Sequence, residues 1–168
     1  MIRFDASSGL VLALAISSSL SAAWWLNHLD GRGRAVAAPV AVAAAHGSDA
    51  QIVRGPDGHY WAEALIDGSA VRVMVDTGAS VVALTREDAA RLGLRLKDAD
   101  FATTVQTASG PVGAARVTLD HVAVAGARVD KVEALVVKDG LPHSLLGMSY
   151  LGRLSRFEAT PAGLTLRP

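Results

Sequence analysis

The 168-residue chain contains no cysteine. Disulfide bonds, thiolate nucleophiles and thiolate metal sites are therefore excluded. The histidines are scattered along the chain and show none of the short spacings, such as His-Glu-x-x-His, by which a helix presents metal ligands. They are His28, His46, His59, His121 and His143. We therefore expect no metal site and no other cofactor.

An excess of charge of either sign is also lacking. The sixteen lysine and arginine residues balance the sixteen aspartate and glutamate residues, so the formal net charge at pH 7 is zero. Proteins that bind nucleic acid usually carry a basic excess clustered on one face. Without such an excess, a nucleic-acid partner is not expected.

Charged side chains are missing from the stretch between Ala6 and Leu26. A membrane-spanning helix needs about 20 mainly apolar residues, and Trp24 and Trp25 fit the aromatic belt at a membrane surface. Residues 1–30 are therefore predicted to be a membrane anchor. A signal peptide cleaved near Ser21-Ala22-Ala23 and a buried soluble helix are the alternatives. Basic residues flank both ends, so charge does not set an orientation.

The rest of the chain divides into a linker, residues 31–49, and a folded domain, residues 50–168. The linker is rich in glycine, alanine, valine and proline and has no amphipathic period. In the domain, short apolar runs alternate with turn residues, which predicts a mainly β domain or barrel. Strands are expected at Gln51–Arg54, His59–Ile66, Ala70–Val75, Val81–Leu84, Phe101–Thr107, Val112–Leu119, Val122–Val124, Val129–Val137, Phe157–Ala159 and Leu164–Leu166.

One or two short helices interrupt this pattern. Thr85 is a typical N-cap, acidic residues follow in the first turn, and Gly93 is a typical residue just after a helix end. A helix is therefore expected at about Arg86–Leu92. A second short helix is expected at Leu145–Leu154.

The segment Val73-Met74-Val75-Asp76-Thr77-Gly78-Ala79-Ser80 places a carboxylate directly after an apolar strand. Aspartate is disfavoured within strands, and burying its carboxylate is costly unless hydrogen bonds compensate. Asp76 is therefore either a surface-turn residue or a carboxylate held in a cleft.

Two further segments favour the cleft. Val81-Val82-Ala83-Leu84 follows directly, and Ser144-Leu145-Leu146-Gly147-Met148 comes later. This order resembles the pepsin-like and retroviral aspartic proteases, in which an Asp-Thr-Gly loop is followed by a hydrophobic-hydrophobic-Gly segment that passes behind it. The block Leu145–Leu151 is most similar to the membrane-anchored bacterial branch of retropepsin-like proteases. The resemblance covers about Gln51 to Leu166 and implies a retropepsin-like closed β-barrel, the acid-protease fold, with one lobe per chain.

The family implies an aspartic endopeptidase that cleaves polypeptides. Hydrolysis needs a base that activates water and an acid that protonates the leaving nitrogen, and two carboxyl groups about 3 Å apart can share one proton and do both. The chain has a single Asp-Thr-Gly, so the second carboxylate is expected from a second copy, in a homodimer with its axis at the active site. By resemblance Asp76 is catalytic, and the active-site loop is Thr77, Gly78, Ala79 and Ser80. By resemblance Gly147 packs behind this loop; the alternative is a plain helix-start residue between Leu146 and Met148, and neither role is catalytic.

A flap that closes over substrate is also implied by the resemblance. The hairpin turn Thr107–Pro111 lies at a suitable distance after Asp76, with Ala108, Ser109 and Gly110 at its tip. An ordinary solvent-exposed hairpin is the alternative.

Two other functions stay open. The domain could be a non-catalytic, membrane-tethered β module that binds an extended peptide, or Asp76 could lie in a surface turn of an unrelated β protein. The resemblance implies a single-pass inner-membrane protein with its domain in the periplasm, or secretion to the periplasm after signal cleavage.

Overall fold

The computed structural model describes residues 44–107 and 110–168. The predicted anchor, residues 1–30, and most of the predicted linker lie outside this part. Within it, none of the helices is both long enough and apolar enough to cross a membrane.

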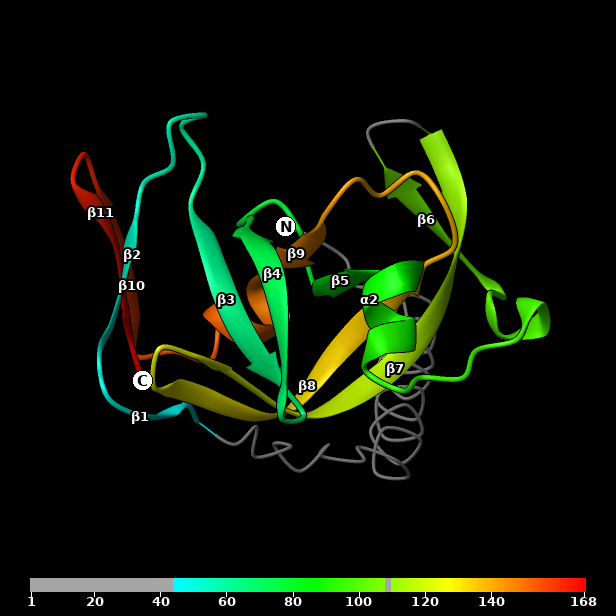
Figure 1. Ribbon diagram of the computed structural model, residues 1–168, viewed down its shortest axis with the longest axis horizontal. Coiled ribbons are helices and arrows are strands. Elements are labelled where there is room, and N and C mark those ends of the chain that lie inside the picture. The colour runs from blue at the N-terminus through cyan, green and yellow to red at the C-terminus, as the bar shows by residue number, and fades with distance from the viewer. Residues whose placement is uncertain (1–43, 108–109) are drawn as a thin grey trace, which may run out of the picture. The chain divides into compact units, whose positions relative to one another are not determined.

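The described chain is mainly β, as predicted, with short helices (Figure 1). Its strands are β1 (His46–Gly47), β2 (Ala50–Val53), β3 (Trp61–Ile66), β4 (Ser69–Val75), β5 (Val82–Thr85), β6 (Thr103–Thr107), β7 (Gly110–Val124), β8 (Ala127–Val137), β9 (Ser144–Leu146), β10 (Arg156–Thr160) and β11 (Gly163–Arg167). Its helices are α2 (Arg86–Arg91), the 3₁₀ turn η1 (Asp98–Asp100) and α3 (Met148–Leu151).

The larger sheet closes on itself. Its strands follow the order β1-β8-β5-β9-β4-β3-β7-β6, and an additional pairing joins β8 to β7. The path β8-β5-β9-β4-β3-β7 therefore returns to β8 as a ring, which removes the open edges from these strands. This ring is the closed barrel that the sequence predicts.

Side chains alternate between the inside and the outside of the barrel, as the pleat of a strand requires. In β3, for example, Ala62, Ala64 and Ile66 are buried, whereas Glu63 and Leu65 are exposed. Aliphatic residues of β4, β5, β7 and β8 fill the interior with them. The core consists mostly of alanine, valine and leucine, which explains how a chain with few aromatic residues fills a narrow barrel.

A smaller sheet stands beside the barrel. Its order is β10-β11-β2, and both pairings are antiparallel. Tyr60, just before β3, connects it to the barrel, because its hydroxyl donates to the Thr160 carbonyl at 3.1 Å. In this sheet β11, near the end of the domain, pairs with β2, near its start.

Several boundaries differ from the sequence-based expectations; the strands expected at Val112–Leu119 and Val122–Val124, for example, are one continuous strand, β7. Leu145–Leu154 is not one helix: Ser144–Leu146 form β9, Gly147 is extended, and only Met148–Leu151 are helical. The first half joins a sheet because it lies between β4 and β5 and supplies hydrogen bonds to both. At the other end of the domain, His46 and Gly47 fall within the predicted linker, yet they pair with Arg128 and Ala127 of β8.

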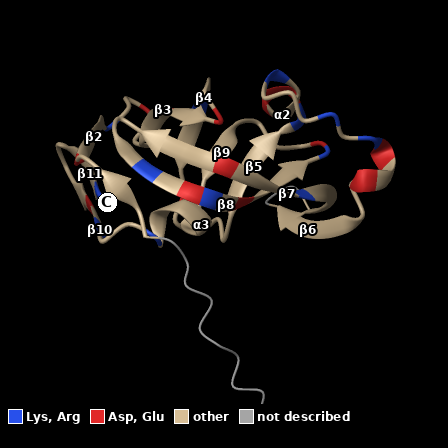
Figure 2. Ribbon diagram, turned by 90° about the horizontal axis from the view of Figure 1, so that it is seen from below, with Lys and Arg blue, Asp and Glu red and all other residues tan. Residues whose placement is uncertain are grey.

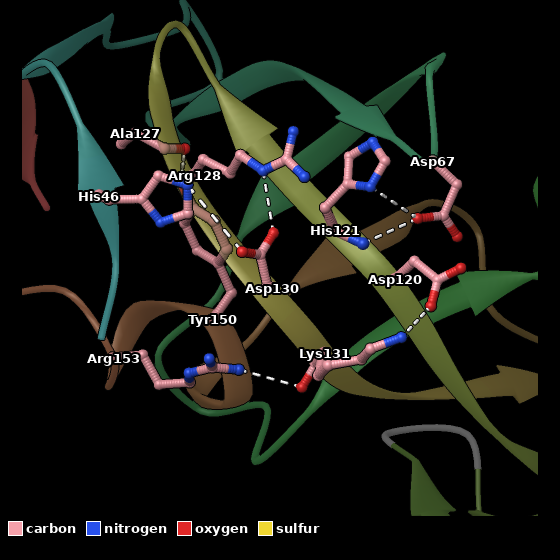
Figure 3. A network of polar contacts seen from close by, with 10 residues as sticks. All are labelled: His46, Asp67, Asp120, His121, Ala127, Arg128, Asp130, Lys131, Tyr150 and Arg153. Atoms are coloured by element: carbon pink, nitrogen blue, oxygen red, sulfur yellow. Dashed lines mark hydrogen bonds and ion pairs between the residues drawn. The ribbon is translucent and has the colours of Figure 1, made fainter. Parts of the chain in front are cut away.

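Charges of both signs are interspersed on the surface, and β8 carries basic and acidic residues in close succession (Figure 2). Figure 3 shows ten residues around the β7–β8 hairpin, where Asp130 pairs with Arg128 at 2.9 Å and lies 3.9 Å from His46. Beneath them, the buried hydroxyl of Tyr150 in α3 donates to the Ala127 carbonyl at 2.8 Å. This hydrogen bond fastens α3 to the barrel.

Replacing Tyr150 with phenylalanine should lower the free energy of unfolding by about 1–3 kcal/mol, because the buried Ala127 carbonyl loses its donor. Burial raises the pKa of Tyr150. The folded state therefore holds this proton more tightly than the unfolded chain does. The contribution of this buried phenol to the free energy of unfolding is fully present below about pH 10, the ordinary pKa of tyrosine. It is lost as the pH rises further.

Denaturant unfolding between pH 7 and pH 11 tests this, with Tyr60→Phe as the matched control in the chain's other tyrosine. Tyr150→Phe should show less alkaline destabilisation than the parent. An equal alkaline loss in Tyr150→Phe and the parent would contradict the assigned role of the buried phenol.

Candidate active site

Asp76 directly follows β4, and the loop 76–81 leads from β4 to β5. These two strands are consecutive in the chain but are not neighbours in the sheet, because β9 lies between them. β9 runs parallel to β4, with Val75 opposite Leu146. The backbone N–H of Asp76 donates to the Leu146 carbonyl at 3.2 Å. The loop that carries Asp76 therefore passes over the end of β9.

Hydrogen bonds within the loop turn the backbone sharply after Asp76. The carboxylate oxygen Oδ1 of Asp76 accepts a hydrogen bond from the Gly78 N–H at 2.8 Å. The backbone carbonyl of Asp76 accepts one from the Ala79 N–H at 3.3 Å. Asp76 is half-buried, whereas Thr77, Gly78 and Ser80 are exposed. The carboxylate is thus oriented by the backbone while it stays accessible.

Gly147 supports this loop from behind. A Cβ atom at this position would lie 2.2 Å from the Val81 carbonyl oxygen and 2.6 Å from that of Ala79. The next residue, Met148, donates its N–H to the Ala79 carbonyl at 2.8 Å. Only glycine permits so close an approach between two backbones. The structure confirms the packing position that the family resemblance implies for Gly147.

Two serines flank Gly147 and fasten the far side of the loop. Ser149 accepts from the Val82 N–H at 2.9 Å and donates to the Glu133 carbonyl of β8 at 2.7 Å. Ser144 is fully buried and accepts from the Thr85 N–H at 3.0 Å. Neither serine stands out in the sequence, because its partners lie on strands that only the fold brings together.

A buried carboxylate completes this support. Asp88 of α2 accepts hydrogen bonds from the hydroxyls of Ser144 and Thr85, and it pairs with Arg91 at 2.9 Å. The pattern Thr85-x-x-Asp88 marks a helix N-terminus in the sequence, but it does not reveal that Asp88 also holds β9. These partners satisfy the carboxylate of Asp88, which does not line the groove that contains Asp76.

Asp76 lies at the edge of a groove of about 1150 Å³. The floor of the groove is a continuous row of outward-facing side chains from neighbouring strands. Strand register places them in the order Met74, Leu145, Ala83, Leu135 and Arg116. Four of the five are apolar, so the groove presents an apolar surface that leads away from the carboxylate.

The predicted flap is the β6–β7 hairpin, on the side of the barrel where the loop after β4 lies (Figure 1). Val105, Gln106 and Thr107 of β6 line the groove. The Thr107 hydroxyl donates to the Gly110 carbonyl at 2.8 Å, and Gly110 adopts a left-handed φ of 112°. Ala108 and Ser109, predicted at the flap tip, lie outside the described residues.

The predicted site residues therefore come together in part. Asp76, Gly78, Ala79 and Ser80 line the groove, and Thr77 extends from the same loop into solvent. Residues 44–107 and 110–168 contain no cluster of three or more side chains that could hold a metal ion.

The chain is similar to known proteins in sequence and in fold. The sequence profile of the family described as "gag-polyprotein putative aspartyl protease" matches residues 62–153, more than half of the chain. The crystal structure of a retropepsin-like aspartic protease from Rickettsia conorii is similar, with 36% sequence identity and a TM-score of 0.65. The match covers 73% of this chain and 92% of that one. The chain belongs to the retropepsin-like aspartic protease family.

Two curated bacterial relatives, both uncharacterized, are similar in sequence. One from a Sinorhizobium species is 39% identical over 112 residues, which cover 66% of this chain and 48% of the relative. One from Rickettsia prowazekii is 40% identical over 106 residues, which cover 63% and 46%. The matched region thus spans about half the length of these relatives.

Replacing Gly147 with alanine should displace the active-site loop, because the new Cβ meets backbone atoms that cannot move independently. The free energy of unfolding should fall by at least about 2 kcal/mol. The Met148 N–H, which is bonded to the Ala79 carbonyl, should exchange with solvent at least about tenfold faster. Amide hydrogen exchange measured by NMR tests this.

Gly68→Ala is the matched control. Gly68 lies in the β3–β4 turn with a φ of 87°, and no heavy atom outside its chain neighbours lies within 4 Å of the place that an added Cβ would occupy. The change therefore introduces turn strain alone. Local exchange at Met148 should remain as in the parent. If Gly147→Ala also left that exchange unchanged, the close packing behind the loop would be refuted.

Proposed function

We propose that the chain is an aspartic endopeptidase in which two copies each supply one Asp76 carboxylate. The observation that carries the proposal is the half-buried Asp76, oriented by the Gly78 N–H at one end of an apolar groove. Family membership supports the same chemistry. The single Asp-Thr-Gly of the chain supports a shared site.

The mechanism follows from two carboxyl groups that share one proton. The ionised group accepts a proton from a water molecule as the water oxygen attacks the peptide carbonyl carbon. The protonated group gives its proton to the carbonyl oxygen, which yields a tetrahedral diol. The group that took the proton from water then gives it to the nitrogen as the C–N bond breaks, and the other group regains its proton from a diol hydroxyl. The products are a carboxylic acid and an amine, and no covalent enzyme intermediate forms.

A second copy fits the exposed face of the loop. Thr77 is exposed directly beside Asp76, so a partner chain can reach both residues. A two-fold axis there would bring each Asp76 next to its copy, in the isologous arrangement that is commonest among homodimers. By resemblance, the Thr77 hydroxyls would hydrogen-bond across that axis.

An extended polypeptide is the substrate class that suits the groove. Among the described strands, β6 is at the end of the sheet order, so one of its edges has no strand partner. Its backbone can hydrogen-bond an added strand, while alternate side chains of the peptide enter the apolar row. Such a peptide would pass between the β6–β7 hairpin and Asp76.

We also propose that residues 1–30 tether the domain to the inner membrane, with the domain in the periplasm. The uncharged stretch between Ala6 and Leu26 supports this proposal. A tether would raise the local concentration of the domain and so favour pairing of two copies. Secretion to the periplasm after cleavage is the alternative, and N-terminal sequencing of the protein from cells distinguishes the two.

Asp76→Asn should abolish peptide cleavage while the fold is retained, because the change removes the base and keeps the shape of the side chain. The full chain is incubated with a mixed peptide library from acidic to neutral pH, and products are read by mass spectrometry. We expect an acidic optimum with a bell-shaped profile, whose two apparent pKa values belong to the pair. Asp120→Asn, which removes a surface carboxylate paired with Lys131, is the control.

A folded parent that binds peptides without cutting them would favour the non-catalytic binding module instead. In that case Asp76→Asn should bind as the parent does.

Mixing tests whether the site is shared. When parent and Asp76→Asn chains are allowed to exchange in equal amounts, about one quarter of the dimers should carry two aspartates. Activity per total protein should fall to about one quarter of that of the pure parent, whereas dilution with an unrelated protein should leave about one half. A fall to only one half on mixing would show that a single chain suffices.

A further inference from the structure

The connection from β8 to β9 separates two hollows on the outer face of the barrel. We call residues 139–142 the dividing loop. Gly140, Leu141 and Pro142 line the groove that contains Asp76, and the same three residues line a second hollow of about 710 Å³ on their other side. Figure 1 shows this connection in orange, on the side of the barrel where the loop after β4 lies. The dividing loop is thus one wall of the proposed substrate groove.

This wall has little support along its length. In the described chain, residues 139–143 form no hydrogen bond and no ion pair. The dividing loop lines a hollow on each side, and Gly140 and Pro142 are exposed. Its position therefore depends on what holds its two ends.

The end next to β8 is held by the backbone. Lys138 donates its N–H to the Gly113 carbonyl of β7 at 2.9 Å, and its ammonium group lies 3.5 Å from Asp98. Beyond this residue, at Asp139, the chain enters the dividing loop.

The end next to β9 is held by an aromatic contact. The imidazole ring of His143 meets the indole of Trp61 with 4.9 Å between the ring centroids and 81° between the planes. Perpendicular rings at such a distance attract each other, because the positive edge of one faces the negative face of the other. Strand register explains why these two rings meet. Val73 of β4 is opposite Ser144 of β9, so His143, one residue earlier, lies beside Arg72 of β4. The strand on the other side of β4 is β3, and β3 begins at Trp61.

Trp61 is itself fixed in place. Its indole N–H donates to Oδ2 of Asp57 at 2.8 Å, and the guanidinium carbon of Arg72 lies 4.8 Å from its ring centroid. The hydrogen bond from the indole lowers the pKa of Asp57, so the acceptor is ionised through the mildly acidic and neutral range. Trp61 is also directly opposite Met74, which lines the Asp76 groove. The contacts with Asp57 and Arg72 hold the Trp61 side chain in place beside the groove, and His143 attaches the dividing loop to this side chain.

We propose that Trp61 and His143 are positioning residues that fix the position of the dividing loop, which is one wall of the substrate groove. They thereby determine how tightly Leu141 and Pro142 bind a side chain of the peptide. This inference rests on the proposed peptidase function. Trp61 and His143 lie outside the Asp76 groove itself. They act by holding the dividing loop, so their loss should weaken substrate binding more than the chemical step.

A probe of the loop that does not depend on activity is possible because the chain contains no cysteine. Asp139→Cys introduces a single thiol at an exposed position of the dividing loop in the full-length protein, and a nitroxide attached there reports local mobility by its electron paramagnetic resonance line shape. His143→Ala and Trp61→Leu should each narrow the line, which indicates faster motion. His143→Phe, which keeps a ring against Trp61, should restore the broad line of the parent.

Kinetics of the unlabelled variants give the second readout, with the peptide that the parent cleaves fastest in the mixed library. His143→Ala should raise KM by about 2- to 10-fold while kcat stays within about twofold, which corresponds to the loss of one aromatic contact. His143→Phe should return KM to the parent value. His121→Ala, in a histidine that lies by Asp67 away from the groove, is the matched control for both readouts.

An unchanged line shape in folded His143→Ala would overturn the proposal, and so would a loss confined to kcat. If the parent cleaves no peptide, the proposed function fails, while the line shapes still decide whether this contact holds the dividing loop. If Trp61→Leu does not fold, the comparison of His143→Ala with His143→Phe decides alone.

Discussion

The contact on which the structure depends most is the passage of Gly147 behind the loop 76–81. β9 separates β4 from β5, so the loop between these two strands has to pass over the end of β9, and the backbones approach within a distance that no side chain tolerates. This contact holds the loop against the end of β9, and the Asp76 carboxylate that the loop carries lines the groove. Main-chain hydrogen bonds from Asp76 to Leu146 and from Met148 to Ala79 fasten the loop to this passage.

Buried polar groups reinforce this arrangement from outside the groove. Ser149 links the start of β5 to β8, and Ser144 links the end of β5 to Asp88 of α2. Each donor and acceptor is satisfied, since the described chain contains no buried side-chain nitrogen or oxygen without a hydrogen-bond partner. Fully satisfied networks of this kind specify one arrangement of strands, because any other would leave polar groups unpaired in the core.

The groove combines parts of different rigidity. Its floor is formed by paired strands, and Asp76 is held by the backbone. Two of its walls differ from this floor. Among the described strands β6 is at the end of the sheet order, and the dividing loop is held at its ends. A rigid floor suits a reaction that needs carboxylates at fixed positions. In the proposed peptidase, these two walls would flank the bound peptide.

The sequence alone determined the features that depend on local chemistry. Alternating apolar runs and turn residues predicted most of the strands, Thr85 and Gly93 predicted the limits of α2, and the order of Asp76 and Gly147 predicted the family. The tertiary structure decided what depends on distant partners. Ser144–Leu146 became a strand because it entered a parallel ladder, although its apolar pattern also suits a helix. The contact of Trp61 with His143 joins residues that are far apart in the chain, so only the register of β3, β4 and β9 could bring them together.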